Sequence, residues 1–378
     1  MSKSYKIPND YNIYSALSTG KVSDSVINTL FLKRGIILGA KTTRENKADY
    51  FSSFMHGFND FETISAQHSK VERAEYTSST NLHTKLEVAD LVSIVSNIKS
   101  SLETNLGNIQ LKEVSQKMNE SGNVLSVEFE YEKFHPEKQL FAQIENKKSV
   151  LTFKKIDDKD QFYLEHPATP EMILWSESVI NTLNGQDDTL TVDKIDLIGL
   201  TNPSLYWQFF DELTSSLGKY KRKNVVEILF KDPNSNESDD EDEGIYKLIS
   251  ASYRGNQLHM SADFMEKLEE GYRLYRFNWD CTDSTVTDSD KYRLSIKVTY
   301  DESGKSNFSF ISKGFYKNKE GKYAKTLNSI PNSLDLEFNK LVFINGISLL
   351  EQLTSKPLKV MIPIKEEDSK AQPNGSDG

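Results

Sequence analysis

Apolar residues near the start of the chain recur at the spacing of an amphipathic helix. One such stripe consists of Val22, Val26, Ile27, Leu30 and Phe31. Gly35 is placed to end this helix in a left-handed conformation. Thr42 and Glu45 have the spacing of a capping box, which predicts the start of a second helix. A further helical stripe covers residues 86–104, whereas residues 59–80 fit either a helix or an exposed strand.

After residue 120 apolar and polar positions alternate, which is the period of a strand with one buried face. Leu125, Val127, Phe129 and Tyr131 alternate here with Ser126, Glu128, Glu130 and Glu132. Further strands are predicted at residues 149–156, 161–167, 194–200, 224–230, 272–279, 292–300 and 307–317. Helices are predicted at residues 171–183, at 203–217 behind the N-cap Asn202, and at 261–270.

These elements predict an α+β fold, with a helical N-terminal module followed by a mixed region of mainly antiparallel sheet. No internal sequence repeat is detectable. The expected divisions are a helical module at 1–60, a helical or ambiguous connector at 61–120, α+β domains at 121–220 and 221–362, and a disordered tail at 363–378. The second α+β domain contains an acidic loop at 232–244.

Composition narrows the classes of protein further. The chain of 378 residues has a formal net charge of -10, yet residues 1–60 hold eight bases and five acids, a local excess of +3. The single cysteine, Cys281, excludes an intramolecular disulfide and fits a reducing compartment. The first residues lack the apolar core of a secretory signal, and no apolar run approaches the roughly 20 residues of a membrane span. We therefore expect a cytoplasmic protein without a membrane partner.

The stretch from Leu30 to Phe51 carries a recognisable pattern. A leucine-rich helix end is followed by Lys33, Arg34 and Gly35, then by Ile36, and then by Gly39 and Lys41 before the second helix. This pattern resembles a helix-extension-helix module of the SAP type. The resemblance implies DNA contact through the connector and the second helix's N-terminus, where free backbone amides favour phosphate. The candidate DNA-binding residues are Lys33, Arg34, Lys41, Arg44 and Lys47. A packed helical corner, or a module that binds a protein partner, is the alternative interpretation of the same residues.

Other polar groupings give no catalytic signature. The histidines are His56, His68, His83, His135, His166 and His259, and their spacing supports no metal site, so each is expected to be structural or exposed. The acids of residues 236–244 lack the alternation of a calcium loop and predict a solvated loop. Aromatic and basic residues interleave at 272–279 and 313–325, as in a stacking platform for single-stranded nucleic acid or in a half-buried strand.

The leading hypothesis is a non-enzymatic accessory or adaptor protein without a cofactor, whose N-terminal module contacts DNA or a protein partner. Frequent Lys, Asn, Ser and Ile are typical of AT-rich bacterial genomes. Large proteins of this organisation without a housekeeping signature are often found in mobile-element or phage-defence operons, so such a system is the expected setting. One alternative is a nucleic-acid-processing enzyme whose site is assembled from residues distant in sequence. Another is an acidic mimic of nucleic acid that binds a basic protein.

Overall fold

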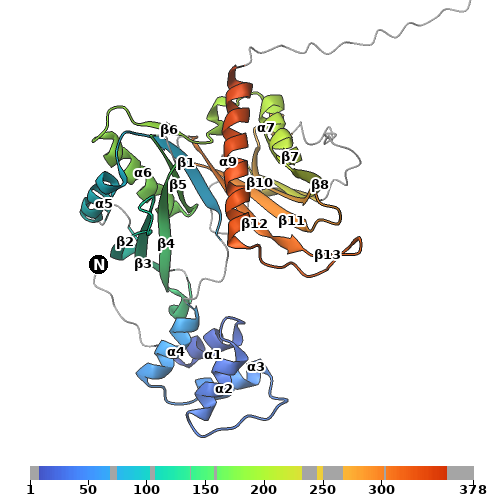
Figure 1. Ribbon diagram of the computed structural model, residues 1–378. Helices are drawn as coiled ribbons and strands as arrows, with labels where there is room; N and C mark the ends of the chain where they lie inside the picture. The colour runs from blue at the N-terminus through green and yellow to red at the C-terminus, as the bar shows by residue number, and fades with distance from the viewer. Residues whose placement is uncertain are drawn as a thin grey trace, which may run out of the picture.

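A computed structural model of the protein describes residues 8–68, 75–102, 107–136, 138–156, 160–231, 245–249, 267–301 and 304–355. The acidic loop at 232–244, the tail at 363–378 and most of the helix expected at 261–270 lie outside the described residues. The remainder is an α+β protein, in which a lobe of helices precedes a mainly antiparallel sheet (Figure 1). None of the described helices is long and apolar enough to span a membrane.

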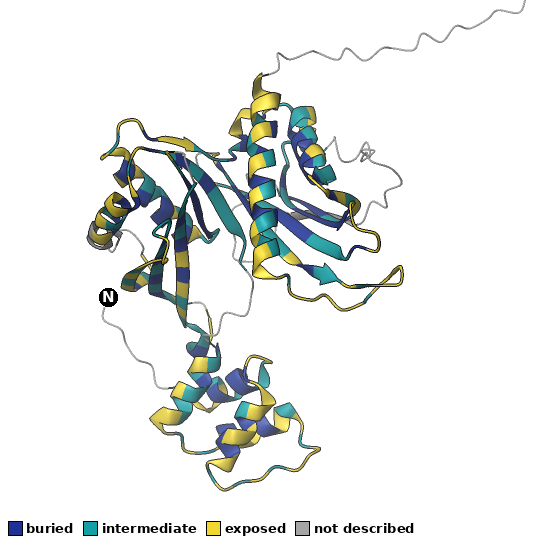
Figure 2. Ribbon diagram, in the orientation of Figure 1, coloured by how far each residue is buried: buried dark blue, intermediate teal, exposed yellow. Residues whose placement is uncertain are grey.

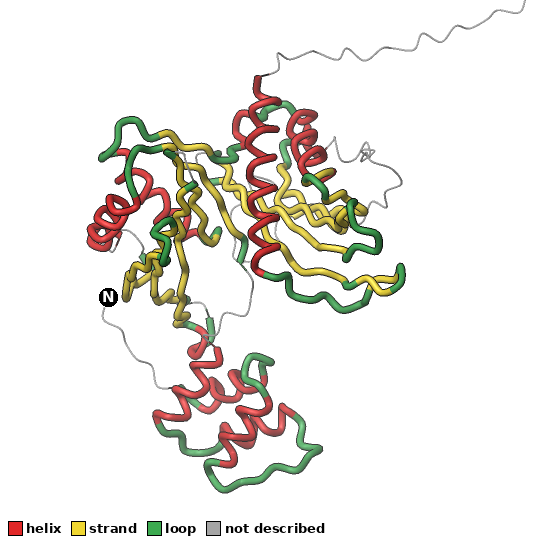
Figure 3. Tube along the Cα trace, viewed as in Figure 1, coloured by secondary structure: helices red, strands yellow, loops and turns green. Residues whose placement is uncertain are grey.

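Four helices form the N-terminal lobe, which stands apart from the sheet (Figure 3). They are α1 (Asp10–Ser18), α2 (Asp24–Leu32), α3 (Arg44–Ser52) and α4 (Phe58–His68). The expected module at 1–60 therefore extends to the end of α4, because Ile64 belongs to its core. The short 3-10 helix η1 (Leu140–Ala142), between two strands of the sheet, contributes Phe141 to the same core. This contact joins the lobe to the sheet.

The ends of the lobe's helices test the sequence predictions directly. Gly35 has φ +73°, so it adopts the left-handed conformation expected after the first helical stripe. The predicted capping box at Thr42 and Glu45 is wrong by one residue. Thr43 is the N-cap of α3, and its hydroxyl accepts a hydrogen bond from the Asn46 amide at 3.3 Å.

The first half of the sheet is a four-stranded antiparallel meander between two helices. Its elements are α5 (Val88–Leu102), β2 (Ile109–Met118), β3 (Val124–Phe134), β4 (Ile144–Lys155), β5 (Gln161–Pro167) and α6 (Pro170–Asn184). The strands predicted around residues 125–131, 149–156 and 161–167 and the helix at 171–183 are confirmed. The described residues of the expected connector at 61–120 that follow α4 instead belong to the sheet region, since they supply β1 (Thr77–His83), α5 and β2.

The second half repeats this order of elements. It consists of α7 (Pro203–Ser215), β8 (Tyr220–Lys231), β10 (Arg273–Asp283), β11 (Lys291–Tyr300), β12 (Ser306–Tyr316) and α9 (Asn332–Ser355). Short strands β7 (Ser216–Leu217) and β9 (Ile245–Ile249) pair with β8, and β13 (Asn318–Lys319) pairs with β14 (Lys322–Tyr323). Two halves with one connectivity thus exist without a detectable sequence repeat.

Strand β1 joins the halves, because β5 lies on one side of it and β12 on the other. Alternate side chains of β5 point to opposite faces of the sheet. Phe162 and Leu164 pack into the core under α5 and α6, whereas the Tyr163 ring lies 5.4 Å from the Phe343 ring of α9. The helices of the two halves therefore cover opposite faces of one sheet, and Figure 2 shows the buried positions along both halves.

One predicted strand does not form. Residues 194–200 contain the 3-10 helix η2 (Leu197–Gly199), and only β6 (Thr191–Asp193) before it pairs, with β1. The Asp196 carboxylate accepts a hydrogen bond from the Ile198 amide at 3.1 Å, which turns the chain locally. Ile195 and Leu197 are buried in the second core, so their apolar character serves packing and not a sheet ladder.

Candidate functional site

Three of the five predicted DNA-binding residues make contacts inside the N-terminal lobe. The Arg34 guanidinium donates to the Met55 carbonyl at 2.8 Å and to the Asp60 carboxylate at 2.7 Å, and it lies 5.0 Å from the ring centres of Phe51 and Phe54. The Lys47 side chain is largely buried, with its amino group 3.5 Å from the Asp24 carboxylate.

Arg44 joins the end of α1 to the start of α2. Its guanidinium donates to three backbone carbonyls, those of Leu17 at 3.0 Å, Thr19 at 2.9 Å and Val22 at 2.7 Å. It also donates to the Asp24 carboxylate at 2.7 Å. A guanidinium with this many internal acceptors has little donor capacity left for a phosphate.

Lys33 and Lys41 are the two predicted residues that remain exposed, and neither forms an ion pair within the described residues. The same lobe exposes large apolar side chains: Leu32 is 62% exposed, Ile37 86%, Met55 94% and Phe58 74%. These exposed apolar side chains make the lobe a candidate for contact with a protein partner. The SAP-type resemblance and its DNA contact stay predictions.

The second half of the sheet presents a polar face opposite α7 and α9. Tyr76 from the chain before β1 reaches this face, where its hydroxyl lies 2.8 Å from the Ser295 hydroxyl. Asp280 is buried on it and accepts from Arg293 at 2.8 Å and Asn224 at 3.2 Å, while the Lys291 amino group lies 3.3 Å away. No helix among the described elements packs against this face.

Three cations on the polar face have no ion-pair partner among the residues that the structure describes. They are Arg276 of β10, Lys297 of β11 and Lys313 of β12. Two of them make cation–π contacts with the Tyr275 ring: Arg276 lies 5.6 Å and Lys297 5.0 Å from the ring centre. Partial removal from water, and then the nearby Arg276 charge, lower the pKa of Lys313. An anion held between these groups would relieve their mutual repulsion.

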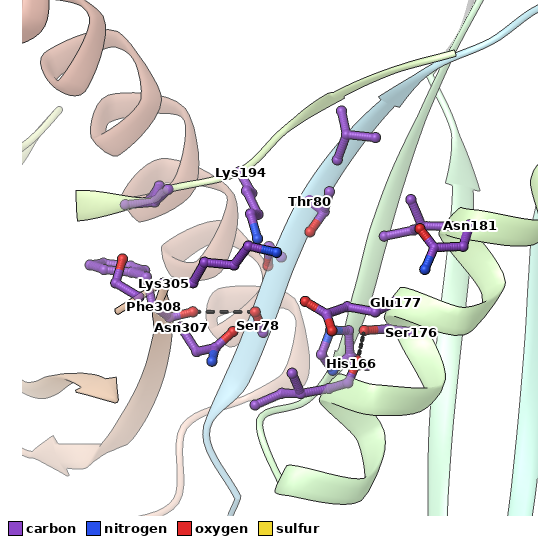
Figure 4. Close-up of a pocket in the computed structure, with 16 residues that line it drawn as sticks. Ser78, Thr80, His166, Ser176, Glu177, Asn181, Lys194, Lys305, Asn307 and Phe308 are labelled. Carbon is purple, nitrogen blue, oxygen red and sulfur yellow. Dashed lines mark hydrogen bonds between the residues drawn. The ribbon is translucent and has the colours of Figure 1, made fainter. Parts of the chain in front are cut away.

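A pocket opens on the α6 side of the junction between the halves. β1 pairs with β5 from Thr77 to His83, but it pairs with β12 only at Thr77 and Phe310. Where β1 and β12 separate, α6 and the chain after β6 enclose a cavity of about 270 Å³. Figure 4 shows polar side chains of its lining, which come from β1, β5, α6, the chain after β6 and the start of β12. They include Ser78, Thr80, His166, Glu177, Lys194, Lys305 and Asn307.

His166, at the end of β5, is the most buried titratable group of the pocket and is 5% exposed. Burial lowers the pKa of its imidazole, which is therefore neutral near pH 7. Its Nδ1 lies 2.9 Å from the Pro167 carbonyl, which can only accept, so Nδ1 carries the proton. The Nε2 atom is then an unprotonated acceptor at the pocket wall. The sequence alone predicted only that His166 would be structural or exposed.

We expect the two buried histidines, His68 and His166, to make stability fall in mild acid. Burial lowers the pKa of both, so the native state resists protonation that the unfolded chain accepts below about pH 6.5. The free energy of unfolding should then decrease by up to about 1.4 kcal/mol per pH unit for each histidine as the pH falls through this range. Urea unfolding at pH 7.0, 6.0 and 5.0 measures the slope.

The His68→Gln/His166→Gln variant is the control for this pH dependence, because it removes both titrating groups. Its free energy of unfolding should change less between pH 7.0 and 5.0 than that of the unmodified protein. Equal slopes in the two proteins would assign the lost stability to other groups.

Within the described residues, no three His, Cys, Asp or Glu side chains are grouped as a metal ion requires. No protein-family model matches the chain, and no curated protein matches its sequence. The two polar sites and the N-terminal lobe are the candidate functional surfaces of the described residues.

Proposed function

We propose that this protein is a non-enzymatic accessory protein that binds single-stranded nucleic acid on the polar face of β10, β11 and β12. The observation that carries the proposal is a group of three cations without an ion-pair partner among the described residues. Arg276 and Lys297 lie over the Tyr275 ring, and Lys313 is close enough to Arg276 to feel its charge. Phosphates pair with such cations, and bases stack on aromatic rings beside them. The Tyr316 ring lies at the edge of the same face, 5.0 Å from the Arg293 guanidinium.

The main nucleic-acid contact then lies on the sheet and not, as the sequence pattern implied, on the N-terminal lobe. Arg34 and Arg44 are engaged by acceptors of the lobe itself, whereas Arg276, Lys297 and Lys313 of the sheet face have no ion-pair partner among the described residues. The overall charge of -10 does not oppose a local site, because phosphate responds to charges within about one Debye length, roughly 8–10 Å. Lys33 and Lys41 would provide a second, smaller contact.

The test is binding of a labelled single-stranded oligonucleotide across a salt series, measured by fluorescence anisotropy. In Arg276→Gln/Lys297→Gln/Lys313→Gln we expect affinity to fall by at least about tenfold. The slope of log affinity against log salt should become shallower by about 0.7 for each phosphate that the variant no longer neutralises. A matched control is Lys85→Gln/Lys117→Gln/Lys340→Gln, which removes the same charge from exposed lysines on other elements.

The Lys33→Gln/Lys41→Gln variant tests the N-terminal prediction in the same assay. A larger loss here than in the sheet variant would place the nucleic-acid site on the helical lobe and overturn our assignment. Unchanged binding in this variant would mean that the lobe does not contact nucleic acid. The second candidate function, binding of a protein partner by the lobe, would then be favoured by its exposed Ile37, Met55 and Phe58 side chains. Absence of binding by the unmodified protein at low salt would contradict the proposed function.

A further inference from the structure

The pocket between α6, β1 and the start of β12 has the size of a site for a small organic molecule. Its volume of about 270 Å³ lies near the lower limit of ordinary ligand pockets, about 300 Å³. The cavity therefore has room for one small organic molecule.

Two lysines bring like charges into this pocket from segments far apart in the sequence. Lys194 follows β6 and Lys305 precedes β12, and both side chains extend over β1 toward Thr80 in Figure 4. Neither forms an ion pair within the described residues. The Thr80 hydroxyl points into the same space and can donate a third hydrogen bond. This arrangement favours an anion with several oxygen atoms, such as a phosphate.

The opposite wall of the pocket presents hydrogen-bond acceptors instead of positively charged donors. Nδ1 of His166 is occupied by the Pro167 carbonyl, which leaves Nε2 as an acceptor. The Glu177 carboxylate of α6 points toward the cavity and has no ion-pair partner in the described part of the chain. The His166 Nε2 atom and the Glu177 carboxylate can only accept hydrogen bonds, so a molecule that satisfies them must present donors such as hydroxyl groups.

We propose that this pocket binds a small phosphate monoester of a polyol. Lys194, Lys305 and Thr80 contact the phosphate, and His166 and Glu177 accept hydrogen bonds from the hydroxyl groups. The site shares no residue with the nucleic-acid face of β10, β11 and β12, so this inference does not rest on the proposed function. The two can fail separately.

The probe is ribose 5-phosphate, with inorganic phosphate and ribose as its two parts, measured by isothermal titration calorimetry. We expect ribose 5-phosphate to bind more tightly than inorganic phosphate and ribose to bind least. In Lys194→Gln/Lys305→Gln both phosphate probes should weaken by at least about tenfold, because two charge-assisted hydrogen bonds are removed. Lys117→Gln/Lys340→Gln is the matched control and should bind like the unmodified protein.

The Glu177→Gln variant tests the acceptor side of the pocket independently of the two lysines. It should reduce the difference in affinity between ribose 5-phosphate and inorganic phosphate, because a weaker acceptor replaces the carboxylate, without weakening inorganic phosphate. Equal losses of affinity in the pocket and control variants would show nonspecific attraction and overturn the proposal. So would the absence of heat with ribose 5-phosphate up to about 10 mM, where a site with a Kd of about 1 mM would be nearly saturated.

Discussion

Replacing Trp175 with alanine is expected to lower the free energy of unfolding by about 3–5 kcal/mol. Trp175 is 1% exposed and joins α6 to the sheet. Its ring is stacked on Phe129 of β3 and meets Tyr131 edge-on, with both centres 4.9 Å away. Alanine leaves a cavity that the surrounding strands cannot close, because the meander holds Phe129 and Tyr131 in register. Urea unfolding followed by far-ultraviolet circular dichroism measures the loss of stability.

Trp175→Phe is the matched control for this prediction. Phenylalanine keeps an aromatic ring against Phe129, and it removes the indole N–H, which has no acceptor within hydrogen-bond distance among the described residues. An N–H buried without a partner is unfavourable, so its removal offsets part of the reduced packing. We expect Trp175→Phe to cost clearly less than Trp175→Ala. Equal losses of stability in Trp175→Phe and Trp175→Ala would contradict this expectation. They would mean that an aromatic ring packed against Phe129 does not by itself stabilise α6.

The second large effect is expected in the N-terminal lobe. Arg44→Ala removes the donor shared by three carbonyls and the Asp24 carboxylate. We expect the lobe to lose about 2–4 kcal/mol, since hydrogen bonds from a charged group each contribute about 1.5–3 kcal/mol and some carbonyls will regain water. Backbone amides of α1, α2 and α3 should then exchange hydrogen at least about 30-fold faster, as the lower figure implies. Amides of β10 and β11 should be unaffected.

Lys41→Ala is the matched control for the lobe, because Lys41 is exposed and lies just before α3. Its exchange pattern should match that of the unmodified protein. Unchanged protection of α1 in Arg44→Ala would contradict a structural role for the guanidinium and restore Arg44 as a free candidate for phosphate contact. The experiment therefore separates the two interpretations of the N-terminal stretch.

Local sequence patterns determined most of the secondary structure. The alternation around Phe129 predicted β3, and the apolar stripe through Trp175 predicted α6, because each pattern records which side of one element is buried. The strand expected at residues 194–200 was wrong because Ile195 and Leu197 are buried by a turn, and burial by itself does not distinguish a turn from a strand.

The sequence by itself thus determined the α+β class, the helical start of the chain and the left-handed turn at Gly35. Only the tertiary structure decided which charges are available to a ligand. Arg34 and Arg44 meet acceptors more than 20 residues away, whereas the pocket's lysines, His166 and Glu177 meet where β1 and β12 separate. Such neighbours depend on which face of the sheet each helix covers, and no local period along the chain encodes that choice.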